Sequence, residues 1–138
     1  MNHIFDSSFV LHVSSFMKKI LFIEDEPALQ KTLSSAFTSE GFEVIQALDG
    51  ETGVRLARQK KPDLLLLDLI LPKMDGFEVL RQLQADPETK SIPVVVLTNL
   101  EGMGEVQKVI ELGARDYLVK TNYKLDELVA KVKTSLNL

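Results

Sequence analysis

Residues 64–72, Leu-Leu-Leu-Leu-Asp-Leu-Ile-Leu-Pro, are the most apolar stretch of the chain, and they carry a single acid, Asp68. A continuous run of leucines is typical of a short strand that is buried on both faces of a parallel sheet. An isolated Asp after such a strand is most simply a turn or capping residue. The alternative is a functional group at the carboxyl end of a strand, and the rest of the chain decides between these two interpretations.

Similar short apolar runs alternate with segments of helical period along the chain. The runs predict five strands, at residues 20–23, 43–47, 64–67, 94–97 and 117–119. The segments between and after them predict five helices, at about residues 27–40, 51–59, 76–85, 105–112 and 125–136. This alternating order indicates an α/β domain with a parallel sheet and helices on both faces.

The last predicted helix shows the clearest periodicity. Its apolar residues recur at spacings of three and four, and they are Leu125, Leu128, Val129, Val132 and Leu136. Such spacing gives a helix one apolar face for the core. We expect its lysines to face solvent, namely Lys124, Lys131 and Lys133. The third helix has a shorter inner stripe, Phe77, Leu80 and Leu83.

The composition is that of one globular domain without cysteine. The 20 acidic residues outnumber the 16 Lys and Arg, and the net charge of -4 provides no basic field for nucleic acid or an anionic membrane. The lack of cysteine excludes a disulfide framework, a Cys-ligated zinc site and thiol catalysis. We therefore expect a cytoplasmic protein without nucleic-acid or membrane partners.

Residues 1–17 differ from the rest of the chain. They contain both histidines, one acid and no Lys or Arg, which fits neither a secretory signal nor a membrane span. We predict that residues 1–17 form a poorly ordered extension and that residues 18–138 form the domain. The alternative is that the apolar run at residues 9–11 docks on the domain. We expect no output domain after the last helix.

Polar residues end four of the five predicted strands. In an open α/β sheet, ligands bind outside the carboxyl ends of the strands. The first strand runs into Glu24 and Asp25, the third into Asp68, the fourth into Thr98 and the fifth into Lys120. Three neighbouring carboxylates raise one another's pKa unless a cation joins them, and Mg²⁺ accepts such oxygen ligands while keeping several waters. We therefore predict a Mg²⁺ site at this edge.

The same residues contain the parts needed for phosphoryl transfer. Lys120 supplies a fixed positive charge and Thr98 a hydroxyl donor, and catalysis of this reaction is mostly positioning and charge neutralisation. Asp68 would be the nucleophile that forms an acyl phosphate. Glu26 is left out of the site, because an acid at the start of a helix favours the helix dipole.

This ordered set of residues resembles the receiver domains of response regulators, the CheY-like phosphoproteins of two-component signalling, over residues 18–138. The resemblance rests on the acidic pair, the phosphoacceptor strand, the Pro-x-x-x-Gly loop and three later positions, namely residues 24–25, 64–68 and 71–76 with Thr98, Tyr117 and Lys120. It implies a flavodoxin-like three-layer α/β sandwich, with a five-stranded parallel sheet in the order 2-1-3-4-5 and five helices.

The resemblance also implies the roles of the acidic residues. Asp25, Asp68 and the backbone carbonyl of Ile70 would bind Mg²⁺ directly, and Glu24 would act mainly through water. A sensor histidine kinase or a phosphotransfer protein would donate the phosphoryl group in a phosphorelay. Beyond this self-phosphotransfer and autodephosphorylation, no enzyme activity is implied.

A change of surface on phosphorylation is implied as well. Thr98 and Lys120 would hold the phosphoryl oxygens, and Tyr117 would turn inward behind Thr98 as the switch residue. The face formed by the fourth helix, the fifth strand and the fifth helix would then contact a downstream protein. A monomer, or a weak dimer linked to phosphorylation, is the implied state.

Two residues depart from the family pattern, and two glycines carry a separate prediction. Thr121 stands where the family usually has proline, and a cis bond before a non-proline residue costs about 3 to 4 kcal/mol, so the Lys120–Thr121 geometry stays open. Asn99 stands where a small residue is usual, and it either crowds the pocket or occupies an ordinary turn. Gly102 and Gly104 predict a marginal start of the fourth helix, since each costs about 1 kcal/mol relative to Ala.

Other functional classes stay open on the sequence alone. A receiver-like module could bind partners without any phosphate. A Mg²⁺ hydrolase or nuclease is weakened because no Ser/His or Cys/His pair lies near the predicted site. A flavin or nucleotide binder is disfavoured because the acidic residues 24–26 stand where a glycine-rich phosphate loop is needed.

Overall fold

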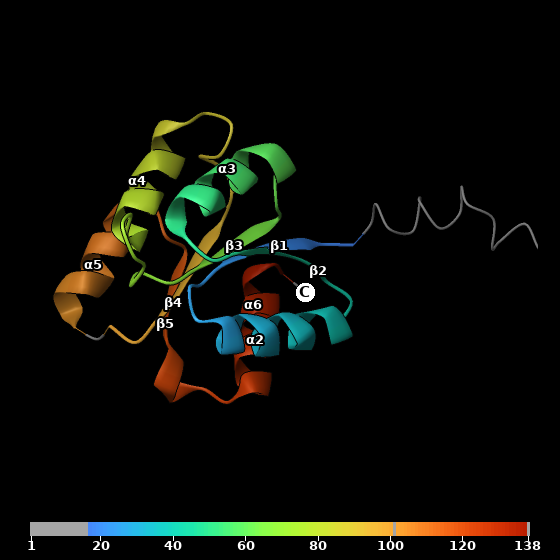
Figure 1. Cartoon of the computed structure of the whole chain (residues 1–138). Helices are drawn as coiled ribbons and strands as arrows, with labels where there is room; N and C mark the ends of the chain where they lie inside the picture. Colours follow the sequence, from blue (N-terminus) through green and yellow to red (C-terminus); the bar gives the residue numbers. More distant parts are fainter. Residues whose placement is uncertain (1–16, 101, 138) are drawn as a thin grey trace, which may run out of the picture.

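The computed structural model describes residues 17–100 and 102–137 (Figure 1). The predictions for residues 1–16, including a docked run at residues 9–11, lie outside the described residues. Among the described residues, no helix combines the length and the apolar character that crossing a membrane requires.

Five parallel strands form one sheet in the order β2-β1-β3-β4-β5, as predicted. The strands are β1 (Lys19–Ile23), β2 (Glu43–Ala47), β3 (Leu64–Leu67), β4 (Val94–Thr98) and β5 (Asp116–Val119). β1 pairs with both β2 and β3, so the chain moves outward on one side of β1 and then on the other. The strand order therefore reverses between β1 and β3, which is where ligands of such sheets bind.

Helices cover both faces of this sheet (Figure 1). They are α2 (Pro27–Ser39), α3 (Gly50–Lys60), α4 (Gly76–Ala85), α5 (Met103–Glu111) and α6 (Leu125–Ser135), and a short 3-10 helix, η2 (Lys120–Asn122), follows β5. α2 and α6 share one face, and α3, α4 and α5 share the other. The predicted flavodoxin-like sandwich of three layers is confirmed.

The apolar strands are continuous because each strand feeds two cores. Along β1, Leu21 and Ile23 enter the core under α3, α4 and α5, whereas Ile20 and Phe22 enter the core under α2 and α6. Successive side chains of a strand point to opposite faces, so a strand covered on both sides has no polar face.

Local signals set the beginnings and ends of the helices. Pro27 occupies the first turn of α2, and Gly41 follows its end with a φ of 91° that favours glycine. Asp49 caps α3, because its carboxylate accepts a hydrogen bond from the Thr52 N–H at 2.7 Å. These signals set the two ends of α2 and the start of α3.

One detailed expectation about the helices, the core placement of Leu125, was wrong. Leu125 is 41% exposed, because the first residue of α6 lies beyond the core that Leu128 and Val129 fill. Lys133 lies at the surface, where its side chain is 35% exposed and contacts Glu40 at 3.1 Å. Phe77 is partly buried and packs against the core that contains Leu80 and Leu83, as the predicted inner stripe requires.

The predicted start of the fourth helix was also inexact. α5 begins at Met103, two residues before the predicted start, because Gly102 turns the chain with a φ of 141°. Gly104 then lies inside the first turn of the helix.

Candidate functional site

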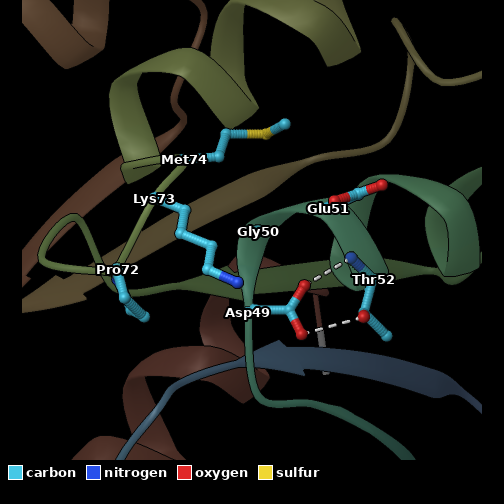
Figure 2. Close-up of a pocket in the computed structure, with 7 residues that line it drawn as sticks. All are labelled: Asp49, Gly50, Glu51, Thr52, Pro72, Lys73 and Met74. Carbon is cyan, nitrogen blue, oxygen red and sulfur yellow. Dashed lines mark hydrogen bonds between the residues drawn. The ribbon is translucent and has the colours of Figure 1, made fainter.

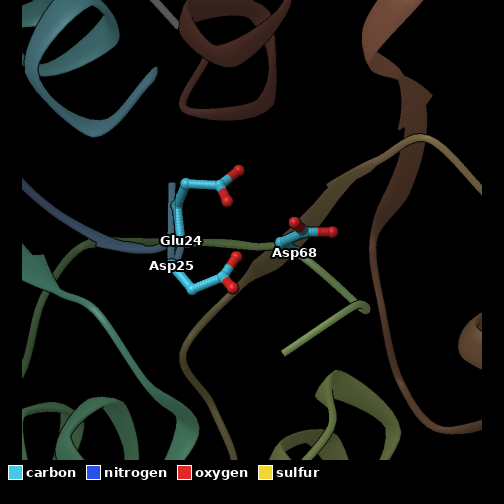
Figure 3. Close-up of side chains that lie close together, drawn as sticks. All are labelled: Glu24, Asp25 and Asp68. Atoms are coloured by element: carbon cyan, nitrogen blue, oxygen red, sulfur yellow. The ribbon is translucent and has the colours of Figure 1, made fainter. Parts of the chain in front are cut away.

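Three carboxylates meet at the carboxyl edge of the sheet, beside the point where the strand order reverses. Glu24 and Asp25 directly follow β1, and Asp68 directly follows β3. Their carboxylate oxygens lie within 4.8 Å of one another. Figure 3 shows Glu24 and Asp25 beside Asp68 at the ends of these two strands. The predicted spatial grouping of these acids is therefore present in the structure.

Lys120 completes this cluster from the far side of β4. It is the first residue after β5, and its Nζ donates to Glu24 Oε1 at 2.5 Å and to Asp68 Oδ2 at 3.0 Å. The side chains are 14% exposed for Lys120, 1% for Glu24 and 5% for Asp68. One ammonium group therefore forms ion pairs with two buried carboxylates at once.

Burial and neighbouring groups shift the pKa values of Glu24 and Lys120. Burial raises the pKa of Glu24 to about 7, and the charge of Asp68 adds to this rise, while the hydrogen bond from Lys120 opposes it. Burial alone would lower the pKa of Lys120, but its hydrogen bonds to Glu24 and Asp68 outweigh burial and raise it. The shared ammonium therefore stays charged but does not fully offset the burial of Glu24.

The donor set of the cluster fits a hard divalent cation. When all groups are ionised, three carboxylates and one ammonium leave a net charge of −2. Carboxylate oxygens are the ligands that Mg²⁺ prefers, and Mg²⁺ usually keeps several waters. Asp25 is exposed, so one side of the cluster is open to water. A Mg²⁺ ion would thus balance the charge without closing the site.

The backbone around Asp68 is held closely. Its N–H donates to the Ile23 carbonyl at 3.0 Å, and its Oδ1 accepts from the Ile70 N–H at 3.2 Å. Gly76 begins α4 against this backbone, because a Cβ at that position would lie 2.6 Å from both the Asp68 carbonyl oxygen and Leu69 Cα. The glycine of the predicted Pro-x-x-x-Gly loop therefore permits a close return of the chain.

Thr98 and Tyr117 lie in the same region and share one neighbour. Thr98 is fully buried at the end of β4, and its Oγ1 accepts from the Leu100 N–H at 3.4 Å. The Tyr117 hydroxyl donates to the Leu100 carbonyl at 2.5 Å. Both side chains thus bind the backbone of the loop between β4 and α5, and their predicted roles toward phosphate stay predictions.

The two residues that depart from the family pattern have ordinary local structure. All peptide bonds of the described chain are trans, including Lys120–Thr121, and the chain continues directly into η2. Asn99 is exposed. Neither residue adds a cis bond or a buried side chain to the site.

Gln30 of α2 was missed by the sequence analysis. Its side chain is only 2% exposed, and its Nε2 donates to the carbonyls of Phe22, Ala47 and Glu24 at 2.9, 3.1 and 3.3 Å. The amide therefore joins α2 to the ends of β1 and β2 directly beneath the acidic turn.

A signal for Gln30 was present in the helical period. Gln30 precedes Leu33 by three residues and Phe37 by seven, so it lies on the apolar face of α2. A polar residue on such a face needs buried hydrogen-bond partners.

A separate cavity of about 260 Å³ lies between the loop before α3 and the loop before α4 (Figure 2). Its lining includes Asp49, Thr52 and Lys73 but none of the three clustered acids. Asp49 already accepts hydrogen bonds from Thr52 N at 2.7 Å and Thr52 Oγ1 at 2.9 Å. Two of its polar side chains, Asp49 and Thr52, therefore serve the cap of α3.

Comparison with known sequences identifies the family. The model of the response regulator receiver domain matches residues 20–133. The DNA-binding dual master transcriptional regulator RpaA of Synechocystis is 42% identical over 120 residues, which cover 87% of this chain and 49% of RpaA. The protein PilH of Pseudomonas aeruginosa is 42% identical over 106 residues, which cover 75% of this chain and 86% of PilH.

The chain spans only part of some relatives. The response regulator PleD of Caulobacter vibrioides is 43% identical over 102 residues, which cover 74% of this chain but 22% of PleD. The similarity to RpaA and PleD thus concerns about half or less of each of those proteins.

Solved structures agree with this assignment. The receiver domain of a sensor histidine kinase from Pseudomonas aeruginosa, with a magnesium ion coordinated in its active-site cleft, is 29% identical with a TM-score of 0.79, covering 88% of this chain and 99% of that one. The chemotaxis protein CheY4 of Vibrio cholerae is 25% identical with a TM-score of 0.80, covering 86% and 98%. The sheet order, the acidic cluster and these matches together show that this chain belongs to the response regulator receiver domain family.

Proposed function

We propose that this receiver domain is a phosphoacceptor switch in which Asp68 takes a phosphoryl group from a phosphohistidine. The donor would be a sensor histidine kinase or a phosphotransfer protein. The observation that carries the proposal is the contact of Lys120 with both Glu24 and Asp68 beside Asp25, which gathers the parts for phosphoryl transfer at one point.

The transfer itself needs one bond to form and one to break. A carboxylate oxygen of Asp68 attacks the phosphorus, and the phosphorus–nitrogen bond of the donor breaks. The electron pair leaves with the imidazole nitrogen, which takes up a proton. The products are an acyl phosphate on Asp68 and a neutral histidine on the donor.

The residues of the cluster divide the remaining tasks. Asp25, Asp68 and the carbonyl of Ile70 would hold Mg²⁺, with Glu24 acting through water. When bound, Mg²⁺ would neutralise charge on the phosphoryl oxygens. Lys120, whose raised pKa keeps it charged, would contact another of these oxygens.

The loop between β4 and α5 would carry the signal outward. In the unmodified chain, Thr98 Oγ1 accepts a hydrogen bond from the Leu100 N–H. The Tyr117 hydroxyl donates one to the carbonyl of the same residue. If the Thr98 side chain rotated toward a phosphoryl group, its Oγ1 would move away from the Leu100 N–H. Tyr117 would then move inward, and the face of α5, β5 and α6 would change for a downstream protein partner. A monomer or a weak phosphorylation-linked dimer would present this face.

Labelling with a small phosphodonor tests the proposal. With Mg²⁺ and acetyl phosphate, intact-mass spectrometry should show one added phosphoryl group on the wild type and none on Asp68→Asn. Asp75→Asn is the matched control, because Asp75 is an exposed acid in the same loop that only caps α4. Equal labelling of the wild type and Asp68→Asn would refute the assignment of Asp68.

A second candidate function is a receiver-like module that binds partners without phosphate. The observation in its favour is that Lys120 already closes the cluster on Glu24 and Asp68 in the unmodified chain. Normal partner binding by Asp68→Ala, together with no labelling of the wild type, would support this candidate instead.

A further inference from the structure

We infer that Gln30 is a positioning residue for the acidic cluster, whose buried amide holds the turn that presents Glu24 and Asp25 to a divalent cation. The inference rests on the proposed Mg²⁺ site but concerns a residue outside it. Gln30 lies on α2, and none of its polar atoms needs to touch the cation for the effect.

The three acceptors of the Gln30 amide surround the base of the acidic turn. The carbonyls of Phe22 and Glu24 lie on either side of the last residue of β1, and the carbonyl of Ala47 ends β2. The distances are 2.9, 3.3 and 3.1 Å, respectively, and the two N–H groups of the amide share the three acceptors. A single side chain therefore fixes two adjacent strand ends relative to each other.

The amide group is itself held in one orientation. Its Oε1 accepts a hydrogen bond from the Ser34 hydroxyl at 3.1 Å, one turn later on the same helix. The backbone N–H of Gln30 donates to the Glu26 carbonyl at 3.0 Å, in the first turn of α2. A rotated amide would place its oxygen against the strand carbonyls, which only accept hydrogen bonds, so these carbonyls select the orientation that donates to them. The Ser34 hydroxyl, which can donate or accept, fits this orientation as a donor.

Holding the Glu24 carbonyl orients the residue that follows it. The peptide group between Glu24 and Asp25 is planar, so fixing its oxygen also fixes the direction of the Asp25 N–Cα bond. The Glu24 N–H donates to the Ala47 carbonyl at 3.0 Å, so this residue is held on both sides. Asp25 is exposed, and its placement therefore depends on the backbone rather than on a surrounding core.

An apolar side chain would fill the same space without burying an amide. Burying an amide is unfavourable unless its hydrogen bonds are made, and here they are directed at the turn that carries the cluster. Partners of this kind, which lie behind the ligands of a metal, commonly change metal affinity by about 10- to 100-fold when removed. The position of Gln30 thus favours a role in setting cation affinity.

The test is an NMR titration of the full chain with MgCl₂ for the wild type and Gln30→Met. Methionine has similar length but no N–H donor. We expect Mg²⁺ binding by Gln30→Met to be about tenfold weaker, with shifted amide signals at residues 24–26 in the absence of the cation. Urea unfolding of each variant identifies conditions in which both are folded.

Thr89→Val is the matched control for a lost buried hydrogen bond. Thr89 is 2% exposed, and its Oγ1 donates to the Leu83 carbonyl at 2.8 Å, at the opposite end of the sheet. This variant should be less stable than the wild type but should bind Mg²⁺ with wild-type affinity. Reduced stability of Gln30→Met with unchanged Mg²⁺ affinity would overturn the inference, because Gln30 would then be only structural.

Two further outcomes, a variant that does not fold and a wild type that does not bind Mg²⁺, can be told apart from those above. If Gln30→Met does not fold, Ser34→Ala takes its place, because it frees the Gln30 amide while keeping its donors. This variant should bind Mg²⁺ about two- to threefold more weakly, and unchanged affinity would overturn the inference. If the wild type binds no Mg²⁺, the proposed metal site fails first and this inference falls with it.

Discussion

Two ion pairs at opposite ends of the sheet have similar distances but different surroundings. At the carboxyl end, Lys120 lies 3.0 Å from Asp68, and their side chains are 14% and 5% exposed. At the other end, Arg58 of α3 lies 2.7 Å from Asp86, and their side chains are 53% and 19% exposed. Distance alone would rank the second pair higher.

Burial reverses this ranking. Water and salt screen an exposed pair, and holding two long side chains costs conformational entropy, so such pairs contribute little to stability. A complete buried ion pair also contributes little net stability. Removing one of its partners, however, leaves a buried charge with no opposite charge beside it. The two ends of the sheet therefore differ in what a single substitution does, rather than in bond length.

The largest expected effect is that of Lys120→Met. Without Mg²⁺ at pH 8, we expect the free energy of unfolding to fall by about 2 to 3 kcal/mol, because Glu24 and Asp68 lose their shared ammonium. Proton uptake by Glu24 limits the loss. Urea unfolding followed by circular dichroism measures it.

Arg58→Met is the matched control at the exposed pair. Its unfolding midpoint should stay close to that of the wild type, since Arg58 is more than half exposed. Equal destabilisation by the two substitutions would show that burial does not distinguish the two ends of the sheet.

The next effect is the pH dependence of Mg²⁺ binding. With a pKa of about 7, Glu24 takes up a proton as the pH falls from 8 to 6. If this proton competes fully with the cation, the Mg²⁺ affinity should fall by up to about tenfold over that range. Calorimetric titrations with MgCl₂ at several pH values measure the change.

The same raised pKa predicts the sign of a stability change without the cation. The folded state holds the Glu24 proton at higher pH than the unfolded state, whose pKa is near 4.5. The contribution of Glu24 is therefore fully present below pH 4.5 and is lost as the pH rises through about 7. Glu24→Gln should remove both pH dependences, and an unchanged pH profile in that variant would assign them to another group.

A smaller effect is expected at the cap of α3. Asp49→Ala removes the hydrogen bonds to Thr52 and should lower the free energy of unfolding by about 1 kcal/mol. A backbone hydrogen bond from Thr52 lowers the pKa of Asp49, so this contribution is present above the usual pKa and is lost as the pH falls below it. Thermal unfolding at pH 7 and pH 3 measures both.

Asp49→Asn sharpens this prediction. Asparagine retains a capping oxygen, so it should keep most of the stability at pH 7 and lose the dependence on acid. A loss as large as that of Asp49→Ala would mean that the charge, rather than the cap, stabilises α3. Mg²⁺ affinity should be unaffected in both variants, because Asp49 lines the separate cavity.

The sheet and the acidic cluster were predictable because their signals are strong and local. Continuous apolar runs mark strands that are buried on both faces, and polar residues directly after them must gather at one edge of a parallel sheet. For this reason reasoning from order alone brought together Glu24, Asp25, Asp68 and Lys120. In the structure the carboxylate oxygens of the three acids lie within 4.8 Å of one another, and Lys120 contacts Glu24 and Asp68.

Other features depend on packing that the sequence does not encode locally. The amide of Gln30 finds carbonyls of two strands, which are adjacent only once the sheet has formed. Leu125 fits the helical period but lies beyond the core, because the period does not tell where the sheet ends. The contacts of Thr98 and Tyr117 with Leu100 likewise need the folded loop.

The most direct test of the central claim is the Mg²⁺ dependence of phosphorylation at Asp68. Wild-type protein is incubated with acetyl phosphate in MgCl₂ or in EDTA, and the modified residue is mapped by borohydride reduction and peptide mass spectrometry. We predict one acyl phosphate, on Asp68, formed in MgCl₂ and nearly absent in EDTA. Modification of another residue, or equal labelling in EDTA, would contradict the account.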